Sequence, residues 1–129
     1  MPFDWRDFLI IAHELRQDTR ESVQRTCLGR AYYYVYNLGL EMARQMRWPE
    51  PRYSLHRALW NWCQSHSDMN IKNLGNLGSR MYSLRIASDY TVNRLSDPQA
   101  VPKQLTRARQ FEVRVAQQNG QTPPSSLPI

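Results

Sequence analysis

Arginine, tyrosine and asparagine gather in one short stretch, residues 29–37, which reads Gly-Arg-Ala-Tyr-Tyr-Tyr-Val-Tyr-Asn. Arg30 and Asn37 are two helical turns apart, so on a helix both project from one face, with Tyr33 and Tyr34 between them. A guanidinium suits phosphates, and an amide can hydrogen-bond a phosphate or a hydroxyl group, so this face is a candidate binding surface. The alternative is structural: the tyrosines are packing residues, and Arg30 keeps only its charged end in water.

A second stretch, residues 84–90, reads Leu-Arg-Ile-Ala-Ser-Asp-Tyr. Arg85 and Asp89 are four positions apart on the expected helix, so the carboxylate can orient the guanidinium. The alternative is an ordinary surface ion pair, worth a few tenths of a kcal/mol. If the helices that carry the two stretches pack antiparallel, Arg30, Asn37, Arg85 and Asp89 line one groove.

The three histidines, His13, His56 and His66, are the remaining candidates for a general base. His56 is the best placed, because the proline-containing turn before it can fold back over the end of the helices. The alternative for each is a packed or solvated histidine. His56 and Tyr90 join Tyr33 and Tyr34 as candidate substrate-binding residues. The chain has no Ser-His-Asp set, glycine-rich phosphate loop or metal-ligand spacing, so no metal and no cofactor are expected.

The hydrophobic periodicity predicts the elements that must position these residues: five helices and no strand. The helices are expected at residues 4–17, 18–47, 54–65, 68–92 and 97–119. Gly75 and Gly78 inside the fourth helix indicate either a close helix approach or a frayed start. Residues 120–129 contain three prolines and no periodicity, so we expect a disordered tail. The sequence therefore predicts one all-α domain, residues 1–119.

The charge of the chain is positive and carried almost wholly by arginine. Lysine and arginine number 17 against 11 acidic residues, a formal net charge of +6, and only Lys72 and Lys103 are lysines. Arginine's planar donor fork suits phosphate recognition, although the base composition of the source genome can produce the same bias. The arginine bias therefore favours, without locating it, a nucleic-acid-binding surface.

The rest of the composition excludes several classes of protein. A hydrophobic content of 41% is too high for a disordered chain. The longest apolar run, residues 8–12, is too short to span a membrane, and the acidic start does not resemble a signal peptide. Cys27 and Cys63 lie in apolar contexts, which predicts two free, buried thiols in a reducing compartment. We therefore expect a cytoplasmic protein without membrane partners.

The two motifs, in this order, resemble those of the HEPN domain family (higher eukaryotes and prokaryotes nucleotide-binding). Many bacterial members carry S-R-A-Y-Y-x-x-x-H on the second helix and R-x-x-A-D-Y on the fourth. Residues 29–37 and 85–90 stand in these places, and the resemblance covers residues 4–118. It implies an up-down bundle of four or five helices that forms a symmetric dimer. The facing helices of such a dimer build a positively lined cleft for RNA or a nucleotide.

Catalytic members of the family are metal-independent endoribonucleases with an arginine followed by a histidine on the second helix. The histidine removes the proton of the 2′-hydroxyl group, and the arginine stabilises the charge on the phosphorane. The resemblance makes Arg30, Asn37, Arg85 and Asp89 the candidate catalytic residues. Asn37 stands where the histidine is expected, and an amide does not titrate near neutral pH. Such members commonly serve as toxins or phage-defence effectors, beside a nucleotidyltransferase-type antitoxin or in a larger defence complex.

Three functions therefore stay open, and whether the protein is an enzyme stays open with them. The first is a HEPN-type ribonuclease toxin or phage-defence effector with a degenerate active site. The second is a non-catalytic HEPN module that binds RNA or a nucleotide in the same groove. The third is a helical interaction protein whose groove holds another polypeptide.

Overall fold

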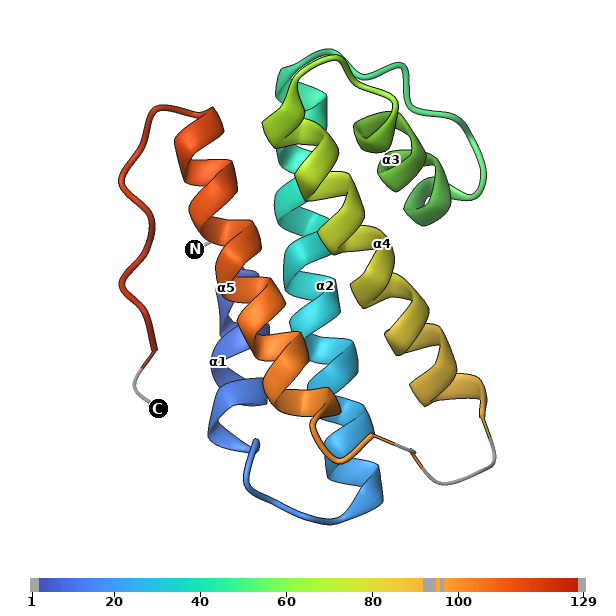
Figure 1. The fold of residues 1–129 in the computed structure, drawn as a ribbon, viewed down its shortest axis with the longest axis vertical. Coiled ribbons are helices and arrows are strands. Elements are labelled where there is room, and N and C mark those ends of the chain that lie inside the picture. The colour runs from blue at the N-terminus through green and yellow to red at the C-terminus, as the bar shows by residue number, and fades with distance from the viewer. Residues whose placement is uncertain (1–2, 92–94, 96, 128–129) are drawn as a thin grey trace.

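The computed structural model describes residues 3–91, 95 and 97–127, which form five helices and no strand (Figure 1). The helices are α1 (Arg6–Glu14), α2 (Glu21–Gln45), α3 (Leu55–Gln64), α4 (Met69–Tyr90) and α5 (Ala100–Gln118). The all-α prediction is confirmed, and each expected helix is present, a little shorter at both ends than its hydrophobic pattern.

Helix α2 is the centre of the bundle and contacts α1, α4 and α5, while α3 packs mainly against α4 (Figure 1). Along the bundle, α1, α2, α4 and α5 alternate in direction (Figure 1). The two motif stretches therefore lie on antiparallel neighbours, α2 and α4, as the predicted groove requires. The remaining face of α2 is open to solvent and carries Arg30.

Helix α3 approaches α4 and α2 where glycines leave room for the indole of Trp60. A Cβ atom added at Gly78 of α4 would lie 2.3 Å from Trp60 Cε3, and one added at Gly39 of α2 would lie 3.1 Å from Trp60 Cη2. At Gly75 the added atom would lie 2.7 Å from the backbone nitrogen of Gln64. The predicted close helix approach is therefore confirmed. The alternative of a frayed start is wrong, because α4 is continuous from its first residue.

The contact at Gly78 leads to the first prediction. We expect Gly78→Ala to lower the free energy of unfolding by about 3 kcal/mol, because the new methyl group overlaps a buried ring that cannot move aside. The control is Gly29→Ala, also within a helix, where an added Cβ meets no atom within 4 Å. There the better helix propensity of alanine should raise stability by roughly 0.5 kcal/mol or more. Urea unfolding of the three proteins measures both changes, and equal effects would contradict the Trp60 contact.

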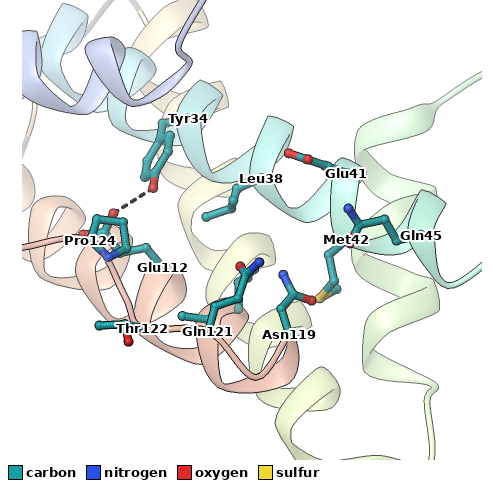
Figure 2. Close-up of a pocket in the computed structure, with 12 residues that line it drawn as sticks. Tyr34, Leu38, Glu41, Met42, Gln45, Glu112, Asn119, Gln121, Thr122 and Pro124 are labelled. Carbon is teal, nitrogen blue, oxygen red and sulfur yellow. Dashed lines mark hydrogen bonds between the residues drawn. The ribbon is translucent and has the colours of Figure 1, made fainter.

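A buried carboxylate joins α1, α2 and α5. The Glu112 side chain is 1% exposed and accepts hydrogen bonds from Arg6 Nε (3.0 Å), Arg109 Nη1 (2.9 Å) and the Tyr34 hydroxyl group (2.7 Å; Figure 2). Burial raises the pKa of the Glu112 carboxyl group, but these hydrogen bonds outweigh it and hold the pKa below its usual value. Glu112 is therefore ionised at neutral pH and fixes three helices at one point. We call these four residues the Glu112 cluster.

The second prediction concerns this cluster. We expect Glu112→Gln to lower the free energy of unfolding by about 3 kcal/mol at pH 7, because Arg6 and Arg109 lose the carboxylate that compensates their charge. The exposed pair Arg44–Glu50 is the matched control, and Glu50→Gln should change stability little.

The difference in the free energy of unfolding between wild type and Glu112→Gln should also depend on pH, with a definite sign. The folded-state pKa of Glu112 is lowered, so the native protein binds fewer protons than the unfolded chain near the ordinary value of 4.5. The stabilisation by Glu112 is therefore full above 4.5 and is lost as the pH falls through the lowered folded-state pKa. Urea titrations of wild type and Glu112→Gln should converge below pH 4.5. A gap that persists unchanged at low pH would contradict an ionised Glu112.

The C-terminal segment, residues 121–127, has neither helix nor strand but lies against the bundle, which differs from the predicted disordered tail (Figure 1). Gly120 has a φ of 65° and reverses the chain, and the Gln121 backbone nitrogen donates to Ala116 O at 2.8 Å. The segment then runs back alongside α5 (Figure 1). The last two residues of the predicted tail, 128–129, lie outside the described residues.

Two predictions from composition can be compared with the fold. Cys27 and Cys63 are both buried free thiols, as predicted. Burial raises the pKa of the Cys63 thiol to about 12, so it stays protonated and unreactive. No helix in the described parts of the chain combines the length and apolar character needed to cross a bilayer.

Candidate functional site

The two arginines singled out by the motifs both lie beside α2 but make their contacts with different helices. The Arg85 guanidinium of α4 reaches across to α2, where Nη2 donates to the Tyr33 hydroxyl oxygen at 2.6 Å. The Arg30 guanidinium of α2 lies over the Phe8 ring of α1, with Cζ 4.7 Å from the ring centroid. Arg30 and Tyr33 are one helical turn apart, so both arginines belong to the open side of α2.

Arg85 is fixed from two sides. Its Nε lies 2.8 Å from Asp89 Oδ2, as the spacing predicted, and its Cζ lies 5.0 Å from the centroid of the Tyr33 ring. The Arg85 side chain is 15% exposed, against 37% for Asp89, so the pair lies at the surface rather than in the core. The carboxylate and the ring hold the guanidinium in one orientation while part of it stays accessible to an anion.

His56, in the first turn of α3, lies beside this pair in a stack of tyrosines. The His56 ring is 3.8 Å from the Tyr36 ring centroid at an interplanar angle of 16°, and 5.5 Å from the Tyr82 centroid at 19°. Its Nδ1 is 2.7 Å from the Tyr32 hydroxyl oxygen. Its ring therefore contacts residues of both motif helices, Tyr32 and Tyr36 of α2 and Tyr82 of α4. We call the seven residues of this cluster the Arg85 site: Tyr32, Tyr33, Tyr36, His56, Tyr82, Arg85 and Asp89.

The hydrogen bonds of the Tyr32 hydroxyl group determine which nitrogen of His56 carries a proton. Trp60 Nε1 lies 3.0 Å from the Tyr32 oxygen, and an indole nitrogen can only donate. The hydroxyl proton of buried Tyr32 is then satisfied among the described residues only by donation to His56 Nδ1. A neutral imidazole whose Nδ1 accepts carries its own proton on Nε2. His56 therefore offers the site an N–H donor.

Burial and charge keep both partners in these protonation states. Burial raises the pKa of the Tyr32 hydroxyl group far above its usual value, so the tyrosine stays protonated. Burial also lowers the pKa of His56, and the positive charge of Arg85 lowers it further. His56 is thus neutral at pH 7. A general base needs a free acceptor nitrogen, and in this arrangement Nδ1 is already occupied.

The other predicted site residues lie in different surroundings. Asn37 is half-buried, and its Nδ2 donates to the backbone oxygen of Tyr33, one turn earlier, at 2.8 Å. Tyr34 points toward α5, where its hydroxyl group donates to Glu112, and it belongs to the Glu112 cluster (Figure 2). Tyr90 is 73% exposed at the end of α4. The structure thus brings Tyr33, His56, Arg85 and Asp89 together, while Arg30, Tyr34, Asn37 and Tyr90 lie outside this cluster.

The Phe8 ring beneath Arg30 belongs to a group of three aromatic rings near the start of α1. The Phe3, Trp5 and Phe8 ring centroids lie 5.2 to 5.5 Å apart, and Phe3 and Trp5 are 55% and 45% exposed. We call these rings with Arg30 the Phe8 cluster. Phe3 and Trp5 precede the first residue of α1, and both remain exposed there.

The motifs also did not reveal Arg25, which holds the end of α4 that carries Arg85. Arg25 Nη1 donates to the backbone oxygens of Ser88 and Thr91, the second at 2.8 Å, where α4 ends. A cation at a helix C-terminus satisfies carbonyls that have no partner within the helix. Arg25 therefore positions the last turn of α4 against α2.

The Arg85 site combines cationic and neutral donors with one carboxylate, so it can bind a phosphate or a hydroxyl group. In the described part of the chain, no three His, Cys, Asp or Glu side chains are placed to share a metal ion. The chain matches no protein-family model, no curated protein and no solved structure. The chemistry of the Arg85 site and of the Phe8 cluster is therefore the basis for any functional conclusion.

The third prediction tests the protonation of His56. In an NMR titration we expect an imidazole pKa below 6.5 and the proton on Nε2 in the neutral form. Arg85→Met should raise this pKa toward 6.5 without reaching it, because burial is the larger cause and stays. Lys103→Ala, which removes one positive charge on α5, is the control and should leave it unchanged. A neutral ring with its proton on Nδ1 would contradict the assigned donor role.

Proposed function

We propose that this chain is a HEPN-type RNA-binding protein that binds single-stranded RNA along the open side of α2 without cleaving it. The proposal depends above all on the hydrogen-bond chain from Trp60 through Tyr32 to His56, which leaves the imidazole a donor. Asn37, at the position where the resemblance expects a histidine, has its amide nitrogen bonded to its own helix. Neither side chain presents the free acceptor nitrogen that would remove a 2′-hydroxyl proton.

The two arginines support RNA as the ligand through their contacts with aromatic rings. Arg30 lies over Phe8 and Arg85 over Tyr33, at 4.7 Å and 5.0 Å from the ring centroids. Unpaired bases stack on aromatic rings and on guanidinium planes, whereas bases inside a duplex are already stacked. Two such arginine–aromatic pairs beside one helix therefore favour a single strand.

The surrounding charge favours a polyanion as well. Besides Arg30, four described arginines are exposed and form no ion pair with a described carboxylate: Arg47, Arg52, Arg57 and Arg80. They extend the net charge of +6 over the α2–α3 connection, α3 and α4. Phosphate contacts of this kind add affinity that does not depend on base sequence and falls with salt.

The fourth prediction tests RNA binding. Anisotropy of a fluorescein-labelled, mixed-sequence single-stranded oligoribonucleotide should show binding by the full chain that weakens between about 50 and about 200 mM salt. Arg30→Ala and Arg85→Ala should each raise the dissociation constant about tenfold, because each removes a stacking cation and a phosphate contact. Lys103→Ala is matched in charge but lies on α5, and it should bind nearly as wild type.

Circular dichroism shows whether each variant is folded before its affinity is compared. Binding that is insensitive to salt would overturn the proposal. Equal losses in Arg30→Ala, Arg85→Ala and Lys103→Ala would overturn the assignment to α2, because only net charge would then matter. A duplex of the same sequence tests the preference for a single strand and should bind more weakly.

A metal-independent endoribonuclease is the second candidate, and the closeness of Arg85 to His56 favours it. Arginine stabilises the charge of the phosphorane, and a histidine with a free Nε2 would be the base. The same RNA, incubated with the protein and EDTA, separates the two functions: cleavage to 5′-hydroxyl ends that Arg85→Ala abolishes would establish the nuclease. Intact RNA under these conditions, with binding retained, would support the binding protein. The homodimer, antitoxin or defence complex that the resemblance implies stays a prediction for either function.

A further inference from the structure

A groove between α1 and α5, on another side of the bundle from the Arg85 site, already holds an extended peptide. The groove is apolar along Leu9 of α1 and Pro102 and Leu105 of α5, and it contains a cavity of about 560 Å³. The occupant is the C-terminal segment, whose Leu127 lies at the cavity and packs against the core. We call this the α1–α5 groove.

The groove recognises the backbone of its occupant through two arginines. Arg6 Nη2 donates to Ser125 O at 2.8 Å, and Arg109 Nη1 donates to Pro124 O at 2.5 Å. Both guanidinium groups are held by buried Glu112, so their remaining N–H groups point outward in fixed positions. Two aligned donors for consecutive carbonyls, followed by an apolar recess, fit an extended segment of the form Pro-Ser-x-Leu. Proline lowers the entropy that such a segment loses on binding.

The segment is held at these few points and bridges open space on both sides. Besides the cavity near Leu127, a second cavity of about 410 Å³ lies between α2, α5 and the part of the segment around Thr122 and Pro124 (Figure 2). Both cavities are open to the surface, so the segment is not packed on all sides. The segment is therefore attached to the bundle as a bound ligand is, rather than built into its core.

A single residue directs the segment to its own bundle. Gly120 has a φ of 65°, the left-handed region, and a Cβ added there would meet no atom within 4 Å. With a right-handed φ at this residue, α5 would continue in its own direction and carry the segment away from the molecule. The contacts of the segment with the groove would then be available only in another molecule.

We propose that the α1–α5 groove is a peptide-binding site that takes the C-terminal segment of a second copy of this chain, so that two copies exchange segments. The sequence of that segment fits, since it makes the same contacts within one chain. Exchange leaves both arginine–carbonyl bonds and the Leu127 contact intact. It changes the chain reversal at Gly120, including the hydrogen bond from Gln121 N to Ala116 O, as a hinge changes in domain swapping. This inference does not depend on RNA binding.

The fifth prediction uses the full-length chain with Gly120→Ala. Alanine disfavours the left-handed conformation, so we expect the dissociation constant of the dimer to fall by about tenfold for each of the two hinges. Size-exclusion chromatography with light scattering over a range of concentrations measures it. Gly29→Ala is the control, because it makes the same change within α2 in open space and should leave the oligomeric state unchanged. Adding Leu127→Asp to Gly120→Ala should abolish the gain.

A cross-link shows where the segment lies in the dimer. A Gly120→Ala chain with Leu127→Cys is mixed with a differently tagged Gly120→Ala chain that carries Thr106→Cys, since both positions line the groove. Mild oxidation should give a mixed disulfide dimer, whereas Ser22→Cys on the exposed start of α2, in place of Thr106→Cys, should not.

Each outcome decides the proposal. A dimer that strengthens with Gly120→Ala, is lost with Leu127→Asp and gives the Leu127–Thr106 cross-link supports exchange. If Gly120→Ala leaves the oligomeric state unchanged, or the gain survives Leu127→Asp, the proposal is overturned. If the mixed cross-link does not form, the exchange proposal is overturned, even if two copies associate through another surface. RNA affinity is read separately in each variant, so a failure of one proposal is not mistaken for a failure of the other.

Discussion

The indole of Trp60 has a place only because two neighbouring helices have no side chain there. It lies against Gly39 of α2 and Gly78 of α4, and its edge meets the Phe111 ring of α5. One side chain thus joins α3 to the three helices that form the core of the bundle. The same ring donates its only N–H to Tyr32, so the position of the indole also sets the hydrogen bonding of the site.

The hydrogen bond from Trp60 to Tyr32 explains why the Arg85 site is better suited to binding than to proton transfer. Tyr32, fixed by Trp60, commits the acceptor nitrogen of His56, and stacking on Tyr36 holds the ring in place. Making His56 a base would require Tyr32 to give its proton elsewhere, and it is buried with no other described acceptor. The packing of the core therefore restricts the chemistry at the surface.

The sequence predicted what depends on spacing, and missed what depends on residues far apart in the chain. Periodicity gave the five helices, and the glycines of α4 gave the close approach to α3. Glu112 shares a helix face with Ala108 and Val115, so periodicity alone would have buried it. Its charge argued against burial. The buried charge is compensated by Arg6 of α1, which lies 106 positions away in the sequence. Tyr34 was assigned to the site for its place between Arg30 and Asn37, but α5 packs on that side.

The arginine bias, ambiguous in composition, separates into distinct uses in the folded chain. Arg6 and Arg109 compensate a buried carboxylate, and Arg25 ends α4, so these three serve the fold. Lysine would replace Arg6 poorly, because a single ammonium cannot reproduce the bidentate fork with which Nε and Nη2 bond both Glu112 oxygens. Arg30 and Arg85 instead lie over aromatic rings, Phe8 of α1 and Tyr33 of α2. In the Glu112 cluster the guanidinium fork of Arg6 reaches both carboxylate oxygens, so part of the arginine bias follows from the geometry of the fold.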